Sequence, residues 1–195
     1  MGEIKSALEL ALERTRDVPS DPDAVLRHES KNAGKRLFAA LRESEDLDVK
    51  AQIETHQSRA RGWVREGLFE SARANLTLPQ SETDIAGLAA VERALVVLAK
   101  DGKQVRQLIG QVRQFFSQYL EERTQVTEAL RRQFEPRIRE REQQLAQQLG
   151  RPVRVDPSSD PEFSKYFQSQ MGQLEQHYRA SLQQVDQHLS SLLRL

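Results

Sequence analysis

Apolar side chains recur at helical spacing along most of the chain, and this pattern predicts an all-α protein. The clearest unit is a heptad that begins at Gln104 and is written twice, QVRQLIG and then QVRQFFS. Its apolar residues occupy two heptad positions and a third that widens the stripe: Val105, Val112 and Tyr119, then Leu108 and Phe115, then Ile109 and Phe116. Three apolar positions favour packing among several helices over a two-stranded coiled coil. The periodicity continues on both sides and predicts one long central helix over residues 84–149.

Two features of this long helix bear on its continuity. Asp101–Gly102 is a turn-like pair, but the apolar period runs through it from Leu95 to Val105, so we expect the helix to continue there. Pro136 removes one backbone hydrogen bond and crowds the preceding turn. Because the apolar period resumes at Ile138, we expect a kink at this proline and not an end.

Shorter helices are predicted before the long one, over residues 4–16, 23–44 and 47–76. Two prolines within residues 18–23 indicate a linker after the first of these helices. A polar stretch around Pro79 separates the third helix from the long one, and either Ser81 or Thr83 is positioned to cap the helix that follows.

A loop and a final helix are predicted after the long helix. Gly150 is a C-terminal stop signal, and two prolines exclude helix from residues 150–160. Asp160, Pro161 and Glu162 then fit an N-cap, a first-turn proline and a first-turn acid. The final helix is expected to run to about residue 193.

The length of each predicted helix fixes how the molecule is expected to fold back on itself. At roughly 1.5 Å per residue, the long helix would span about 100 Å and the last helix about half of that. A loop of about ten residues returns the last helix antiparallel to the long one. We therefore expect the last helix to start beside Leu149, to end near Phe116 and to leave the proximal half of the long helix to residues 23–76.

These elements predict an elongated molecule in three parts. They are an N-terminal helix and linker over residues 1–20, a proximal helical bundle over residues 21–115 and a distal antiparallel hairpin over residues 116–195. The last two parts share the long helix. Because the hairpin has only two helices to cover its apolar faces, we expect a protein partner or a second copy of the chain to bind there.

Net charge and composition narrow the classes of function. The 29 Lys and Arg balance 29 Asp and Glu, which removes the simplest argument for a nucleic acid or an anionic membrane as partner. The absence of cysteine excludes disulfides and thiolate chemistry. The most apolar window, residues 85–99, contains Glu92 and Arg93 and is too short to span a bilayer. We expect a cytoplasmic protein that does not associate with membranes.

The sequence offers no convergent catalytic or metal-binding motif. His177 and His188 share a helix face but would lie roughly 16 Å apart along it, which is too far to hold one ion. No histidine follows a glutamate by three positions, the spacing of di-iron helical bundles. We therefore expect no cofactor, no metal and no enzymatic activity.

Two short stretches are candidate interaction sites. Trp63 is the only tryptophan, and beside Arg61 and Arg65 it would be a recognition anchor if exposed, although core packing is the simpler interpretation. The predicted hairpin tip alternates apolar and basic residues: Arg151, Val153, Arg154 and Val155. This tip would either add a strand to a partner's sheet or fold back over Leu149 and Phe163.

Together these features favour a non-enzymatic structural or adaptor protein that acts through helical surfaces in an assembly or homo-oligomer. An alternative is a nucleic-acid-associated protein that uses arginines of the hairpin: Arg131, Arg132, Arg137, Arg139 and Arg141. Glutamates interleave with these arginines, whereas a nucleic-acid footprint should be a segregated basic patch. A third hypothesis places a ligand pocket inside the proximal bundle.

Two stretches resemble a family of small uncharacterised bacterial helical proteins. They are the opening MGEIKS with Glu13-Arg14-Thr15, and RGWVR at residues 61–65. The resemblance implies a bacterial, cytoplasmic protein of unassigned function, and it assigns no site residues.

Overall fold

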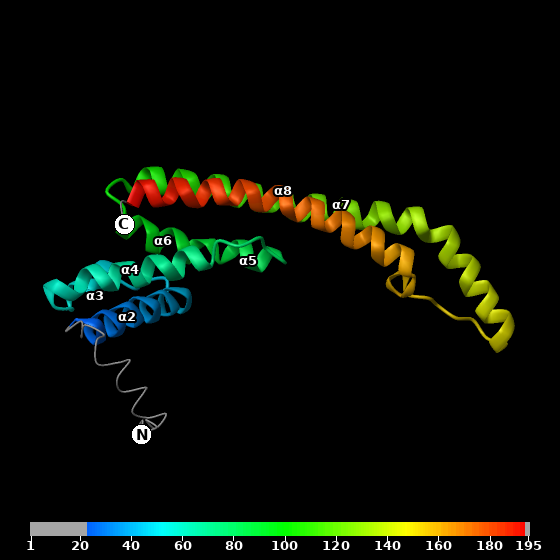
Figure 1. Ribbon diagram of the computed structural model, residues 1–195, viewed down its shortest axis with the longest axis horizontal. Coiled ribbons are helices and arrows are strands. Elements are labelled where there is room, and N and C mark those ends of the chain that lie inside the picture. Colours follow the sequence, from blue (N-terminus) through cyan, green and yellow to red (C-terminus); the bar gives the residue numbers. More distant parts are fainter. Residues whose placement is uncertain (1–22, 194–195) are drawn as a thin grey trace, which may run out of the picture.

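The computed structural model describes residues 23–193, and within that range the chain folds entirely into helices and their connections (Figure 1). The elements are α2 (Ala24–Glu43), α3 (Val49–Glu54), α4 (Ser58–Ala74), α5 (Glu82–Ala86), α6 (Leu88–Leu98), α7 (Gly102–Leu149), the 3-10 turn η1 (Pro157–Ser159) and α8 (Pro161–Leu193). The predicted all-α fold with a long central helix is confirmed. The helix predicted over residues 4–16 lies outside the described residues.

The helices form stacked layers at one end of the molecule, and α7 and α8 extend well beyond them (Figure 1). Helices α2 and α4 run parallel, because Asp23 pairs with Arg59 at one end and Lys35 pairs with Glu70 further along. The α7 residue Arg123 still donates to a carbonyl oxygen of the connection that precedes α5. We call residues 124–173 the distal arm, and α2–α6 with the adjoining parts of α7 and α8 the proximal bundle.

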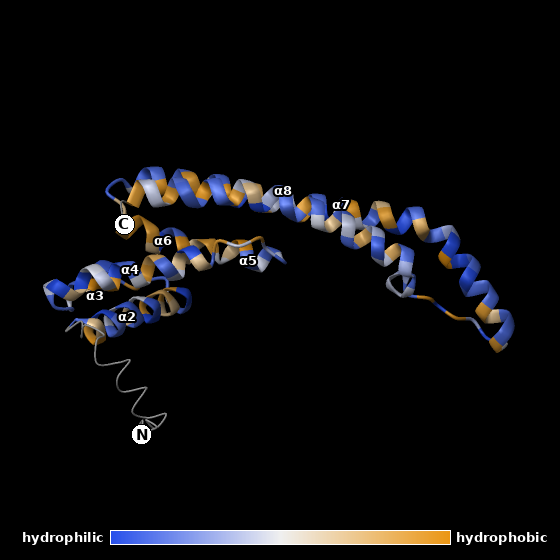
Figure 2. Ribbon diagram, in the orientation of Figure 1, coloured by the Kyte–Doolittle hydropathy of each residue, from blue (hydrophilic) through white to orange (hydrophobic). Residues whose placement is uncertain are grey.

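The main core lies in the proximal bundle. Its buried apolar side chains come from every helix there, including Leu41 of α2, Leu68 of α4, Leu95 of α6 and Ile109 of α7. Figure 2 shows apolar positions concentrated on α6 and on the faces of its neighbours. Leu189 of α8 joins the same core. Burial of this apolar surface provides most of the driving force for folding.

A pair of glycines lets α2 and α4 approach each other closely. A Cβ atom on Gly34 would lie 2.1 Å from the carbonyl oxygen of Val64, and one on Gly67 would lie 2.1 Å from that of Lys31. Any larger side chain would force the two backbones apart. The absence of Cβ atoms at these positions therefore sets the separation of the two helices.

The prediction of one helix over residues 84–149 is wrong in its first part. The chain forms α5 and α6, breaks after Leu98 and reverses direction before α7 begins at Gly102. Asp101 caps α7, because its carboxylate accepts the backbone N–H of Lys103 at 2.9 Å. The apolar period crosses this break because α6 and α7 bury their apolar faces in the same core, one on each side of the reversal.

The prediction of one helix over residues 47–76 is also wrong. Residues 55–57 separate α3 from α4. Asp48 caps α3 by accepting the backbone N–H of Ala51 at 3.0 Å. The chain between α2 and α4 must travel back along the bundle to start a helix parallel to α2, and one straight helix from residue 47 to residue 76 could not make that return.

Helix α8 lies closer to the N-terminal end of α7 than predicted. Phe163 packs against Phe134, with ring centroids 5.5 Å apart, and Tyr178 packs against Phe115 at 4.6 Å. The expected start of α8 beside Leu149 and its end near Phe116 are therefore wrong. The connection after Gly150 is extended and runs back along α7, so α8 begins opposite Phe134 and Arg137 in the C-terminal half of α7.

The signals at the ends of α7 and α8 behave as predicted. Gly150 ends α7 in the left-handed conformation, with φ of 65°. The Asp160 carboxylate accepts the backbone N–H groups of Glu162 and Phe163 at the start of α8. Helix α7 continues through Pro136, and its distal part bends in Figure 1. The lost hydrogen bond and the crowding by the proline ring account for this bend.

Candidate functional site

Residues 151–156, which run back along α7 after Gly150, form the returning segment, and this segment creates a cleft on the distal arm. Two adjoining hollows, of about 360 and 200 Å³, lie between α7, this segment and the start of α8. Both hollows are lined by Arg131 and Pro157, and we call them together the distal cleft. The larger is otherwise lined only by α7: Arg132, Glu135, Ile138, Arg139 and Glu142.

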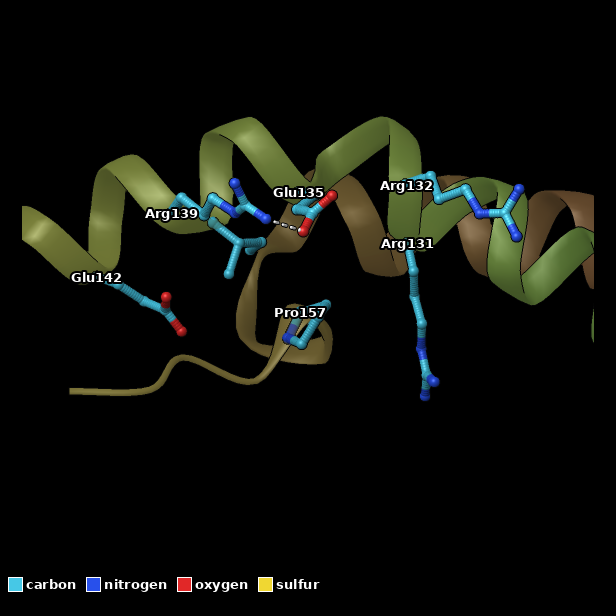
Figure 3. A pocket seen from close by; sticks show the side chains of 7 residues that line it. Arg131, Arg132, Glu135, Arg139, Glu142 and Pro157 are labelled. Atoms are coloured by element: carbon cyan, nitrogen blue, oxygen red, sulfur yellow. Dashed lines mark hydrogen bonds and ion pairs between the residues drawn. The ribbon is translucent and has the colours of Figure 1, made fainter.

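Most charged groups in the larger hollow are engaged with a neighbour, and Figure 3 shows one of these contacts, the ion pair of Arg139 with Glu135. Arg139 pairs with Glu135 at 2.5 Å, and Arg132 pairs with Glu128 at 3.3 Å, each one helical turn away. Glu142 accepts the backbone N–H of Val155 at 2.8 Å and so ties the returning segment to α7. These contacts leave the hollow with little unpaired charge along this wall.

Arg131 differs from these neighbours. Its side chain is exposed, and Figure 3 shows it extending from α7 to the side on which Pro157 lies. The carboxylate of the nearby Asp156 accepts the backbone N–H of Ser158 at 2.9 Å. Hydrogen bonds from the backbone and hydroxyl of Ser158, and then the charge of Arg131, hold the pKa of Asp156 below its usual value. The positive charge of Arg131 thus acts on the Asp156 carboxylate from a distance, without a direct ion pair.

The smaller hollow combines aromatic and polar groups. Phe163 and Phe167 supply its apolar surface, and Thr127, Ser164 and Gln168 add polar groups. The Ser164 hydroxyl donates to the carbonyl oxygen of Ser158 at 2.7 Å, which joins the first turn of α8 to η1. This arrangement offers an apolar surface rimmed by hydrogen-bonding groups, which is the usual composition of a binding site.

An ion pair between a buried carboxylate and a half-exposed arginine joins the start of α8 to α7. Asp160 is buried and pairs with the Nε of Arg137 at 3.0 Å, and Arg137 also pairs with Glu162. Burial alone would raise the pKa of Asp160, but the backbone N–H groups of Phe163 and Glu162 and the charge of Arg137 outweigh it and lower that pKa. Asp160 therefore remains ionised and holds the start of α8 against α7.

The predicted interaction residues of the hairpin tip lie on the returning segment. Val153 and Val155 are half-buried, whereas Arg151 and Arg154 are exposed. The alternation seen in the sequence thus separates an inward apolar side from an outward basic side. The segment folds back along α7, where Glu142 holds it, but it does not cover Leu149, which is 56% exposed.

The other predicted residues lie in the proximal bundle, far from the distal cleft. Trp63 is half-buried, and the guanidinium of Arg27 lies 5.6 Å from the centre of its ring. Arg61 donates to the carbonyl oxygen of Glu54, the last residue of α3, and to that of His56 in the connection that follows. Arg65 donates to that of Leu98 at the end of α6. These two arginines therefore satisfy helix ends, and the structure does not join them to the tip residues in one site.

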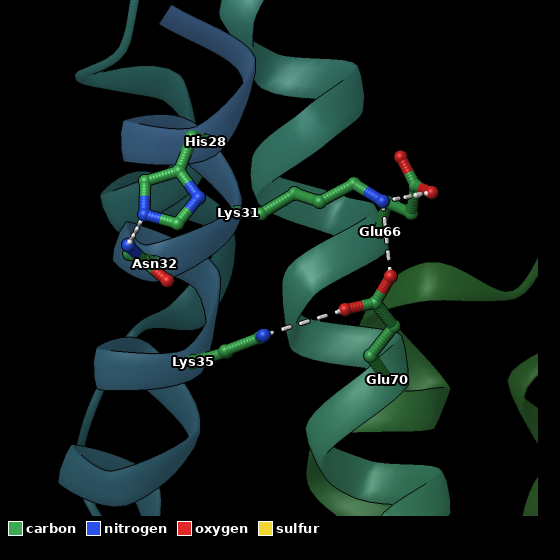
Figure 4. A network of polar contacts seen from close by, with 6 residues as sticks. All are labelled: His28, Lys31, Asn32, Lys35, Glu66 and Glu70. Atoms are coloured by element: carbon green, nitrogen blue, oxygen red, sulfur yellow. Dashed lines mark hydrogen bonds and ion pairs between the residues drawn. The ribbon is translucent and has the colours of Figure 1, made fainter. Parts of the chain in front are cut away.

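Two polar features of the bundle were not identified from the sequence. Lys31 of α2 bridges Glu66 and Glu70 of α4 at 2.5 and 3.0 Å, and these hydrogen bonds raise its pKa (Figure 4). Arg93 of α6 donates to carbonyl oxygens at the end of α2: those of Leu41, Ser44 and Glu45. Both contacts join helices far apart in the sequence, and no local pattern of residues predicts such contacts.

Among residues 23–193, no cluster of three or more His, Cys, Asp or Glu is arranged to hold a metal ion. No helix within the same range has the length and apolar character needed to cross a bilayer.

The fold and the cleft define an all-helical protein with a proximal bundle and a projecting two-helix arm. Residues 50–191 match the model of a family of unknown function (DUF6657), and the chain belongs to this family. The matched range includes α4, α6 and both helices of the arm. The resemblance to an uncharacterised helical family is thus confirmed. Neither the curated proteins nor the solved structures contain a match to the chain.

Proposed function

We propose that this protein is a non-catalytic adaptor that binds another protein through its distal arm. The observation that carries the proposal is the thin core of the arm. Its buried apolar cluster consists of Leu130, Phe134 and Phe163, with Val126 and Phe167 half-buried against it. Two helices alone leave much of their surface uncovered, and helical hairpins commonly complete their packing with further helices or partners.

The exposed side chains of the arm support this role. Tyr166 is 50% exposed and Leu149 is 56% exposed, and both lie on the arm. Large apolar side chains that remain exposed on a projecting element fit a protein interface better than a solvated surface. The ion pairs of Arg132, Arg137 and Arg139 make a nucleic-acid role less favourable, because these groups are already neutralised.

Site-specific photo-crosslinking in the native cell tests the proposal. Benzoylphenylalanine replaces Tyr166 or Arg154 on the arm, and Lys50, an exposed residue of α3, is the matched control in the bundle. We expect crosslinks to another polypeptide from both arm positions and none from position 50. Crosslinks from position 50 alone, or none from any position, would show that the arm is not the interface.

A further inference from the structure

We propose that the distal cleft binds an extended segment of a partner protein that carries a carboxylate next to an aromatic or aliphatic side chain. The inference rests on the proposed function and specifies the chemistry of the partner. The carboxylate would pair with Arg131, and the apolar side chain would lie against Phe163 and Phe167.

Arg131 is the group suited to receive the carboxylate. It lines both hollows of the cleft, and within the described residues it forms neither an ion pair nor a hydrogen bond, although its charge acts on the neighbouring Asp156. The other arginines of the cleft, Arg132 and Arg139, are paired with glutamates. A guanidinium presents its N–H donors in a fixed fork that matches the two oxygens of a carboxylate.

The apolar part of the ligand follows from the surface beside Arg131. Phe163 is only 6% exposed and its ring packs edge-on against Phe134, which makes a rigid base for the smaller hollow. Phe167 stacks on Phe163 with ring centroids 6.0 Å apart and remains partly exposed. A side chain of a partner that covers Phe167 would bury apolar surface and gain aromatic contact.

The acids of the cleft select a peptide over a nucleic acid. Glu135, Glu142 and Asp156 line the same two hollows as Arg131. A phosphate backbone brings a negative charge at every nucleotide. Glu142 and Asp156, which unlike Glu135 form no ion pair within the described residues, would repel it. A peptide can place one carboxylate on Arg131 and uncharged groups opposite the acids. Gln168, which lines the smaller hollow, adds an amide that can pair with the peptide backbone.

Fluorescence anisotropy with the full-length protein tests this inference. The probe is a fluorescein-labelled peptide with a single Glu next to Phe among uncharged residues, compared with the same peptide carrying Lys in place of Glu and with a single-stranded oligonucleotide. We expect only the Glu and Phe peptide to bind. Arg131→Glu should weaken its binding about tenfold or more, because a charge-assisted hydrogen bond is replaced by repulsion.

Lys165→Glu is the matched control, because it makes the same charge change at an exposed position of the arm that does not line the cleft. This variant should bind the peptide within about twofold of the wild type, since exposed charges at a distance are largely screened. Equal weakening by both substitutions would reduce the effect to net charge and overturn the inference. Failure of the wild type to bind the peptide, or tighter binding of the oligonucleotide, would also overturn it. Crosslinks from position 166 without peptide binding would leave the adaptor proposal standing and refute only the proposed ligand chemistry.

Discussion

The close approach of α2 and α4 at Gly67 yields a quantitative test of the packing in the bundle. In Gly67→Ala the new Cβ atom would lie 2.1 Å from the Lys31 carbonyl oxygen, well inside the 3.4 Å at which ordinary contact begins. The obstructing atoms are backbone, so no side-chain rotation relieves the overlap, and the two helices must separate. Overpacking costs about 1–3 kcal/mol, and we take about 3 kcal/mol for a clash between two backbones. The better helix propensity of alanine returns about 1 kcal/mol, which leaves a net loss of about 2 kcal/mol.

Gly62→Ala is the matched control, because Gly62 lies in the same helix and a Cβ there meets nothing within 4 Å. This substitution should raise the unfolding free energy by about 1 kcal/mol. Urea unfolding followed by far-ultraviolet circular dichroism measures both variants, and thermal midpoints should shift by about 2–4 °C per kcal/mol for a chain of this size. If Gly67→Ala proves as stable as the wild type, the two backbones are not in contact and the reasoning fails.

Three further substitutions test other parts of the structure. Arg93→Met should lower the unfolding free energy by about 1–3 kcal/mol in urea, because it leaves carbonyl groups at the end of α2 without their donor; Arg106→Met, at an exposed position of α7, should change it by less than about 0.5 kcal/mol. Phe134→Ala should accelerate hydrogen exchange across the distal arm and leave the bundle protected, since it removes a buried ring from the small core of the arm; uniform loss of protection would contradict this. Burial, with a hydrogen bond to Glu122, raises the pKa of Tyr178 to about 12 from a usual value of 10.0. Because the unfolded chain loses this proton first, the free energy of unfolding should fall as pH rises from 10 to about 12. Tyr178→Phe should abolish this part of the fall in unfolding experiments at high pH.

The sequence predicts the helical class and the distal features well, because local chemistry determines them. The cap at Asp160 and the stop at Gly150 act through backbone groups of their immediate neighbours, so the residues themselves are sufficient evidence. The apolar stripe of α8 likewise has Phe163, Tyr178 and Leu189 buried as expected from their spacing. The continuation of α7 through Pro136 was predicted for the same reason, since the period resumed after the proline.

The errors arise where tertiary contacts override local pattern. The reversal before Gly102 is invisible to periodicity, because both flanking helices face one core and the spacing of apolar residues survives the turn. The parallel pairing of α2 and α4 depends on the closeness permitted by Gly34 and Gly67, which a sequence shows only as two isolated glycines.

The candidate site is also only partly predictable. The basic and apolar alternation at Arg154 and Val155 was recognised, but the cleft requires the returning segment to lie beside Arg131. That juxtaposition depends on the position of α8 along α7. Nothing in the spacing of residues within either helix sets this offset, which is fixed by aromatic contacts such as that between Phe115 and Tyr178.

The placement of Leu189 and Leu193 among side chains from α2 to α6 has a consequence for biosynthesis. During translation these leucines leave the ribosome after all of their core neighbours, and they remain inside the exit tunnel while the earlier helices are already outside. The nascent polypeptide must therefore carry an open apolar groove along the first turns of α7 until α8 has emerged. Such a groove is a natural substrate for chaperones that hold exposed hydrophobic segments.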